Sequence, residues 1–280
     1  MTTPHNAQAA ASRAKSLDVH RWGQLPEFNT CGVGHRRALD AGRQIGENPA
    51  IRAGSLHVEA MVSIGVNGTE GYDTDAKSLI ARWQDVSFEM KHKAVIHLLP
   101  VCPSDVLDVG AGIGTDAAAL AAMGHTVVAV EPVDALRRAG MDLHSSLRIE
   151  WVDDSLPHLA YLRSRQRTFG LIILSAVWMH LDERERSEAM STVDSLLRDD
   201  GMIVMSLRHG PVPDGRRMFD VSAAETVRLA RNHHYRTVLN IETESVQHAN
   251  RRRGVTWSWL AFVKASGGGN AGRSGRSDSG

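Results

Sequence analysis

The sequence predicts an α/β fold with a doubly wound, mostly parallel sheet of seven strands and helices on both faces. Three observations support this. Strand-like apolar runs alternate with helical stretches along residues 69–265. The run Phe169–Leu174 is apolar throughout, which is typical of a strand buried on both faces. A glycine cluster separates the first predicted strand from the next helix, as at the carboxyl edge of an open α/β sheet.

Each predicted strand is a short apolar run bounded by polar or turn-forming residues. The seven strands are expected over residues 105–109, 125–130, 147–152, 169–174, 202–207, 236–241 and 255–263. Helices are expected over residues 76–83, 88–99, 115–123, 133–143, 156–162, 183–198 and 222–231. Pro100 stops the second helix and Gly124 closes the third. Ser222 and Glu225 have the spacing of a capping box at the start of the last helix.

The two ends of the chain lack this patterning. Residues 1–68 show no sustained period of two or 3.6, so we expect an irregular or disordered N-terminal extension, with helix candidates only at 8–17 and 34–45. Met61 precedes the first well-patterned segment, and a true translation start there is the alternative. Residues 266–280 are rich in glycine and serine and predict a flexible tail.

Composition narrows the possible functions. Lysine plus arginine (32) equals aspartate plus glutamate (32), which argues against a protein that mainly neutralises nucleic-acid phosphates. The 280 residues hold two cysteines, too few for a disulfide scaffold. No apolar run is long enough for a transmembrane helix, and the first residues lack the apolar core of a secretory signal. We therefore expect a soluble cytoplasmic protein, monomeric or weakly dimeric.

The glycine-rich turn is the clearest sign of a ligand. Gly110, Gly112 and Gly114 directly follow a strand and open a helix, where backbone N–H groups are unpaired. A dinucleotide fingerprint would place its third glycine at Thr115, and a phosphate-binding loop would need a lysine. Asp108, just before the turn, would repel a pyrophosphate but suits a ligand with an ammonium or sulfonium charge.

An acid at the end of the next strand adds to this pattern. Glu131 follows the run 125–130, and a carboxylate in that place can accept hydrogen bonds from both hydroxyls of a ribose. The alternative is an ordinary surface acid after a strand. The glycine turn upstream favours ribose binding.

The stretch D-V-G-A-G-I-G-T (108–115), followed by A-V-E-P (129–132), resembles the class I S-adenosylmethionine-dependent methyltransferases. Within them it is similar to the small-molecule branch with type 11 or 12 domains. The resemblance covers about residues 70–265 and implies a Rossmann-like fold with S-adenosylmethionine as cofactor. The chain departs from the family at Gly170, where aspartate usually follows Phe169.

The resemblance also implies roles for individual residues. The methionine part of the cofactor would be lined by the first acid and the glycine turn: Asp108, Gly110, Ala111, Gly112 and Gly114. Glu131, beside Pro132, would hold the ribose. An acid after the third strand would meet the adenine amino group, with Asp153 the first choice and Asp154 the second, and one of them would instead cap a helix.

The resemblance assigns the remaining contacts to a lid and to the loop after the fourth strand. Tyr72 would cover the cofactor, and Arg82 would support the lid or the methionine carboxylate. Ser175 and Val177 would contact the cofactor. His180 is either a general base or a structural histidine. Trp178 either stacks on adenine or packs against the next helix.

Other functional classes find less support. The loop Ser175–Trp178 lacks both the Asn/Asp-Pro-Pro-aromatic signature and the Pro-Cys nucleophile of DNA methyltransferases, so nucleic acid is an unlikely partner. His233 and His234 are adjacent rather than at metal-ligand spacing, and we expect no metal. The basic run 251–253 is interpreted as a solvated hairpin tip, and the alternative is a contact to an anionic substrate or to RNA. The sequence thus predicts a methyltransferase for a small-molecule acceptor. An NAD(P)-binding oxidoreductase and a non-catalytic cofactor-binding protein are the alternatives.

Overall fold

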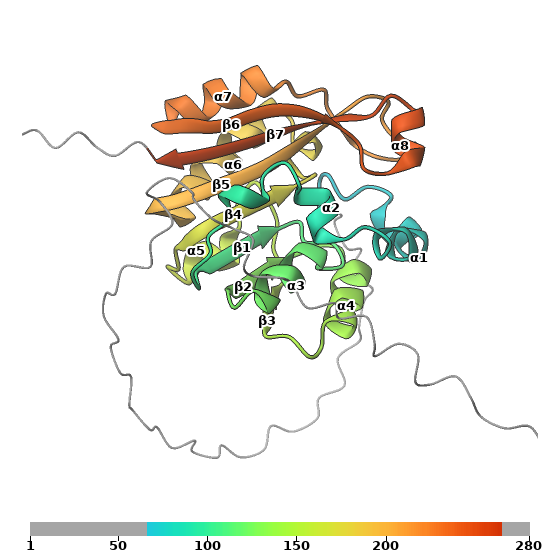
Figure 1. Ribbon diagram of the computed structural model, residues 1–280, viewed down its shortest axis with the longest axis horizontal. Helices are drawn as coiled ribbons and strands as arrows, with labels where there is room; N and C mark the ends of the chain where they lie inside the picture. The colour runs from blue at the N-terminus through green and yellow to red at the C-terminus, as the bar shows by residue number, and fades with distance from the viewer. Residues whose placement is uncertain (1–65, 265–280) are drawn as a thin grey trace, which may run out of the picture. The chain divides into compact units, whose positions relative to one another are not determined.

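The computed structural model describes residues 66–264 and confirms the predicted fold class. One sheet of seven strands has the order β3-β2-β1-β4-β5-β7-β6 (Figure 1). Its strands are β1 Asp105–Val109, β2 Thr126–Val130, β3 Ile149–Val152, β4 Phe169–Ser175, β5 Leu197–His209, β6 Tyr235–Glu244 and β7 Thr256–Lys264. All neighbours pair in parallel except β7, which is antiparallel to both β5 and β6.

Helices cover both faces of the sheet. They are α1 Tyr72–Trp83, α2 Phe88–His92, η3 Ile96–Leu98, α3 Thr115–Ala122, α4 Asp134–Leu143, α5 Ala160–Ser164, η4 Trp178–His180, α6 Glu183–Leu196, α7 Ala223–Asn232 and α8 His248–Arg252. Helices α1 and α8 lie beyond the carboxyl ends of the parallel strands (Figure 1). None of the helices within residues 66–264 is long and apolar enough to cross a membrane.

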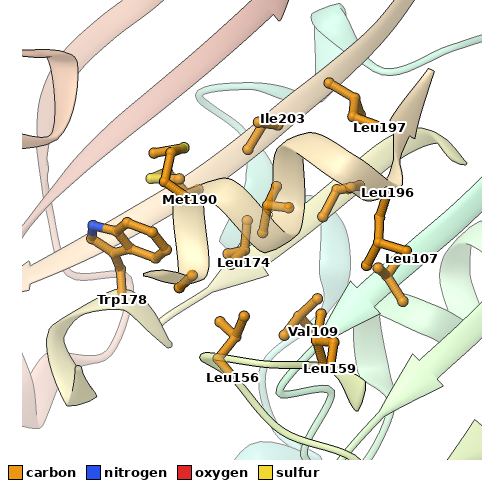
Figure 2. Close-up of a cluster of buried hydrophobic side chains, with 14 of the residues drawn as sticks. Leu107, Val109, Leu156, Leu159, Leu174, Trp178, Met190, Leu196, Leu197 and Ile203 are labelled. Carbon is orange, nitrogen blue, oxygen red and sulfur yellow. The ribbon is translucent and has the colours of Figure 1, made fainter. Parts of the chain in front are cut away.

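Successive strand residues point to opposite faces of the sheet and so build two cores. In β1, Val106 belongs to the core under α2 and α3, while Leu107 belongs to the core under α5, α6 and α7. Figure 2 shows part of the second core, in which side chains from β1, β4 and β5 meet those of α6 and of the loop before α5. This alternation decides which side chains of each strand can reach the cavity that is described below.

Several predicted element boundaries were wrong. The helix predicted over 88–99 breaks after His92, which lets Val95 and Leu99 enter the core beneath β1. The helix predicted over 156–162 begins only at Ala160. Helix α6 ends at Leu196, because Leu197 already pairs with Phe169 of β4.

Two further predictions need correction. The Ser222 side chain accepts the N–H of Glu225 as predicted (3.1 Å), but the Glu225 carboxylate binds Arg186 instead of completing the capping box. The segment expected to be a plain hairpin tip at 251–253 contains the end of helix α8, where Arg251 donates to the carbonyl of Ser245 (2.8 Å). Tertiary partners decide both cases.

The predictions for residues 1–65 and 265–280 lie outside the described residues. These include the alternative start at Met61, the helix candidates at 8–17 and 34–45, and the tail over 266–280. Residues 66–68, which were assigned to the extension, are described and contribute to the site below.

Gly140 of α4 provides a prediction about packing. A Cβ at this position would overlap the ring of Trp151 in β3. Alanine normally stabilises a helix by about 1 kcal/mol over glycine, but overpacking costs about 1–3 kcal/mol. We therefore expect Gly140→Ala to lower the melting temperature in thermal unfolding.

Trp151→Leu supplies the control, since it removes the ring that the new methyl group meets. The double variant should be more stable than the sum of the two single changes implies. Strict additivity would show that the ring does not oppose the methyl group.

Candidate functional site

A cavity of about 770 Å³ opens at the carboxyl ends of β1, β2, β4 and β5. This is the edge at which open α/β sheets bind ligands, and the volume suits a small molecule. The glycine turn and α1 line one end of the cavity. The segments around α8 and the start of β7 line the other.

The first two glycines of the turn face this cavity. Gly110 and Gly112 have φ values of +67° and +59°, a conformation that side chains disfavour. A Cβ on Gly110 would lie 2.5 Å from Cγ2 of Val177, and one on Gly112 would lie 3.1 Å from the ring of Trp83. The turn is therefore packed closely from both sides, and its open edge is the cavity.

Gly114 has a different role from the predicted one. It does not line the cavity. A Cβ there would lie 2.6 Å from the ring of Trp151, so the missing side chain lets α3 approach β3. The third glycine serves helix–sheet packing rather than contact with a ligand.

Glu131 ties the glycine turn to the end of β2. Its buried carboxylate accepts the N–H of Gly112 on Oε2 and that of Val133 on Oε1, both at 2.8 Å. Burial raises the pKa of Glu131 to about 7. An ionised carboxylate has about four acceptor positions, so two remain for a ligand in the cavity.

Three buried polar atoms below the turn have no hydrogen-bond partner among the described residues. They are Oδ2 of Asp108, Oδ1 of Asp116 and Oγ of Ser175. Asp116 and Ser175 line the cavity, whereas Asp108 lies behind the lining, contrary to prediction. The two carboxylate oxygens are acceptors that are costly to leave unpaired, whereas the Ser175 hydroxyl can donate as well as accept and lies close enough to Asp116 to lower its pKa. These atoms mark a place for a cationic or hydrogen-bond-donating group.

Asp116 is a residue that the sequence reasoning missed. Its Oδ2 lies 2.9 Å from Nζ of Lys91 and 3.4 Å from Nε2 of the buried His92. Although burial raises the pKa of Asp116, His92 and Lys91 together hold it below its ordinary value. A signal existed, because Asp116 is the only charged residue in the alanine-rich stretch 115–123.

Asp108 predicts an unusual dependence of stability on pH. Burial, and then the nearby Asp116, raise the pKa of Asp108 from its ordinary 3.8 to about 8. The native state therefore holds a proton that the unfolded chain has lost, so the free energy of unfolding declines as pH rises from about 4 to about 8. Asparagine at this position does not titrate, so it causes no such decline. Asp108→Asn should raise the melting temperature at pH 8.

The melting temperatures of the wild type and of Asp108→Asn should be compared at pH 4 as well as at pH 8. At pH 4 the advantage of the asparagine variant should largely vanish, because Asp108 is then protonated in the native state and about half protonated in the unfolded chain. A difference in melting temperature that stays constant across this range would contradict the raised pKa.

Of the two acids after β3, the second choice of the prediction lines the cavity and the first choice does not. Asp153 is exposed, lies outside the cavity and pairs with Arg137 at 3.2 Å. Asp154 lines the cavity, and its carboxylate accepts the N–H groups of Ser155 (2.9 Å) and Leu162 (3.1 Å). Asp154 thus combines the helix-anchoring and cavity-lining roles that the sequence left open between the two.

Tyr72 and His180 form a hydrogen-bonded pair in the cavity wall. Nδ1 of His180 donates to the carbonyl of Arg217 (2.8 Å), so Nε2 is left to accept from the Tyr72 hydroxyl (3.1 Å). Burial lowers the pKa of His180, which keeps the imidazole neutral at pH 7. Burial also raises the pKa of Tyr72, which keeps its proton. Nε2 of His180 is thus an acceptor nitrogen in the cavity wall that the Tyr72 hydroxyl occupies.

An arginine clasp, made by Arg216 with Asp75 and Tyr72, joins two walls of the cavity. The Arg216 guanidinium pairs with Asp75 of α1 at 2.7 Å and lies 4.3 Å from the centre of the Tyr72 ring. Arg216 follows β5, so the segment after β5 is fastened to α1. Both segments line the cavity.

The other predicted residues divide between cavity and core. Ala111, Pro132, Val177 and Arg82 line the cavity. Trp178 is fully buried in the core, so it packs and does not stack on a ligand. Residues 66–69 also line the cavity, and no pattern in the sequence marked them. Within 66–264 no cluster of three or more histidine, cysteine, aspartate or glutamate side chains is placed to hold a metal ion.

Comparisons with known proteins agree with this geometry. Residues 106–201 match the family model described as a methyltransferase domain. An uncharacterized methyltransferase of Bacillus pumilus is 28% identical over 138 residues, which are 49% of this chain and 58% of that protein. The chain thus matches less than two thirds of this relative's length.

Solved structures share the fold. The 1,6-didemethyltoxoflavin-N1-methyltransferase of Burkholderia thailandensis, with bound 1,6-didemethyltoxoflavin and S-adenosylhomocysteine, has a TM-score of 0.53 at 22% identity, covering 69% of this chain and 87% of that one. A TehB-like S-adenosylmethionine-dependent methyltransferase of Corynebacterium glutamicum has a TM-score of 0.50 at 19% identity, covering 69% and 96%. Residues 106–201 are thus similar to a methyltransferase domain, and the chain shares the fold of these solved methyltransferase structures.

Proposed function

We propose that this chain is a methyltransferase that uses S-adenosylmethionine and methylates a small-molecule acceptor. The observation that carries the proposal is the end of the cavity built by Gly110, Gly112 and Glu131 beside the buried Asp116 carboxylate and Ser175 hydroxyl. The matched methyltransferase domain, residues 106–201, contains all five residues.

The residues present fit the cofactor. The buried Asp116 carboxylate, with the Ser175 hydroxyl beside it, offers acceptor oxygens that suit the ammonium of the methionine part. Glu131 keeps acceptor capacity for the ribose hydroxyls. Asp154 lines the cavity and Asp153 does not, which favours Asp154 as the acid that meets the adenine.

In methyl transfer, the cofactor and the protein supply different parts of the chemistry. When bound, the cofactor supplies an activated methyl group whose bonding electron pair stays on sulfur as the acceptor takes the carbon. The protein positions the acceptor in the cavity and excludes water. Nε2 of His180 is the general base that receives the acceptor's proton, after the Tyr72 hydroxyl releases its hydrogen bond.

Further features belong to the same proposal. A formal net charge of zero favours a small acceptor over nucleic acid, and we expect a cytoplasmic protein. The domain begins at or before Val66, since Val66 lines the cavity. A monomer or weak dimer is expected in solution.

Calorimetric titration with S-adenosylhomocysteine and with NADH tests the proposal. We expect micromolar binding of S-adenosylhomocysteine and no binding of NADH. Binding of NADH would favour an oxidoreductase. Failure of S-adenosylhomocysteine to bind would overturn the cofactor assignment.

A further inference from the structure

The end of the cavity away from the glycine turn contains an arginine without an acid partner. Arg208 stands near the end of β5 and lines the large cavity together with a smaller neighbouring one of about 280 Å³. Its one hydrogen bond among the described residues is a long one (3.4 Å) to the carbonyl of Gly210. No carboxylate within residues 66–264 pairs with it.

Two other arginines in or beside the cavity are paired, whereas Arg82, which lines it from α1, makes no ion pair within residues 66–264. Arg216 binds Asp75, and Arg217 binds Glu185 at 2.8 Å and Asp182 at 3.2 Å. Those guanidinium groups therefore have structural duties. Arg208 has none of this kind, although it is half-buried, and its charge remains available to a ligand.

A second cation lies at the same end of the cavity. Arg253, just after α8, lines the cavity, is exposed and has no ion pair within the described residues. Burial, together with the charge of Arg253, lowers the pKa of Arg208. Two acids lie at this end, Glu244 in the large cavity and Asp220 in the smaller one that Arg208 also lines; both are exposed and neither makes an ion pair with either arginine. An anion placed between the two arginines would relieve their repulsion.

The wall beside Arg208 is aromatic. Arg208 stands directly opposite Trp257 in the antiparallel pairing of β5 and β7, and Ser206 stands opposite Trp259. Directly opposite residues share a face of the sheet, and these four line the cavity. A flat apolar body against this wall would bring an attached anion to the guanidinium.

We propose that the methyl acceptor is a molecule with a flat apolar body that carries a carboxylate, and that the Arg208 guanidinium, with Arg253, holds this carboxylate. The carboxylate anchors the molecule, and a different atom takes the methyl group and loses its proton to His180. The planar fork of arginine matches the two oxygens of a carboxylate. This inference rests on the methyltransferase function proposed above, and it adds the acceptor's charge and shape.

The test uses the full chain saturated with S-adenosylhomocysteine, whose binding is measured first. Ligand-observed NMR titrations then compare benzoate and indole-3-acetate with benzamide and indole-3-acetamide, and inorganic phosphate is titrated separately. At least one acid should bind roughly tenfold more tightly than its amide, as expected for a hydrogen-bonded charge pair. Arg208→Met should reduce this preference to less than about twofold.

Arg253 and Arg252 provide a matched pair of variants on the same short helix end. Arg253→Met should weaken binding of the preferred acid by a smaller factor, about threefold, because this side chain is exposed. Arg252→Met should leave binding unchanged, since Arg252 does not line the cavity. Unchanged affinity for S-adenosylhomocysteine in Arg208→Met shows that this variant is folded, and the wild-type comparison of acids with amides does not depend on it.

The outcomes separate the two proposals. If S-adenosylhomocysteine fails to bind, the methyltransferase proposal fails and the acceptor inference fails with it. If it binds but no acid is preferred over its amide, only the acceptor inference is overturned. A preference that survives in Arg208→Met, or tight binding of phosphate with no binding of the acids, also overturns it.

Discussion

Replacing Glu131 with alanine is expected to weaken binding of S-adenosylhomocysteine by at least about tenfold, or about 1.4 kcal/mol. The change removes the acceptor proposed for the ribose. It also releases the N–H groups of Gly112 and Val133, which the carboxylate holds at 2.8 Å. Because the glycine turn loses its anchor at the same time, the true loss should exceed that of one ligand hydrogen bond. Calorimetric titration measures it.

Glu131→Gln separates these two contributions. Glutamine keeps the shape and one acceptor oxygen but presents an NH₂ group to one of the two backbone amides. Its affinity should fall between those of the wild type and the alanine variant. An alanine variant that binds like the wild type would show that Glu131 does not hold the ribose.

Replacing His180 with glutamine is expected to lower the rate of methyl transfer by about 10²-fold or more, the usual contribution of a general base. Wild-type activity should fall as pH drops through the pKa of His180, which burial holds below its ordinary value of 6.5, because only the neutral ring accepts a proton. Above that pKa, the ionisation of His180 causes no further change in the rate. The glutamine variant should lack the acidic limb. Transfer from methyl-labelled cofactor measures both.

Tyr72→Phe is the companion to this experiment. Phenylalanine keeps a ring beneath the Arg216 guanidinium but removes the hydroxyl that lies 3.1 Å from Nε2 of His180. We expect a smaller loss of rate with the acidic limb retained. A structural role for His180 would instead appear as weakened binding of S-adenosylhomocysteine in His180→Gln, with the acidic limb still present.

The strands were predictable because their signal is local. The strand over 105–109 has its predicted bounds, since a run of buried residues between polar ones forms a strand in any α/β context. The break after His92 was not predictable, because it depends on a core that distant strands build. Helix α8 likewise depends on carbonyls that Arg251 finds only in the folded hairpin.

The residues of the site likewise fall into those that the sequence could locate and those that it could not. Gly110, Gly112 and Glu131 could be located because one strand–turn–helix unit places them together in sequence and in space. Asp153 and Asp154 are adjacent in sequence, so only the direction of the backbone decides which of them faces the cavity. Arg208 could not be singled out among many arginines, because its lack of an acid partner and its place opposite Trp257 are seen only in the fold.

The arginine clasp has a thermodynamic consequence. Asp75 belongs to the wall beside the glycine turn, whereas Arg216 belongs to the segment that continues from the arginine end of the cavity, so ordering one wall orders the other. Whichever of cofactor and acceptor binds first bears the entropic cost of fixing both walls, and the second then binds to a surface already in place. Under the proposed function, the two substrates therefore bind with positive cooperativity, and by linkage each enhances the affinity of the other by the same factor.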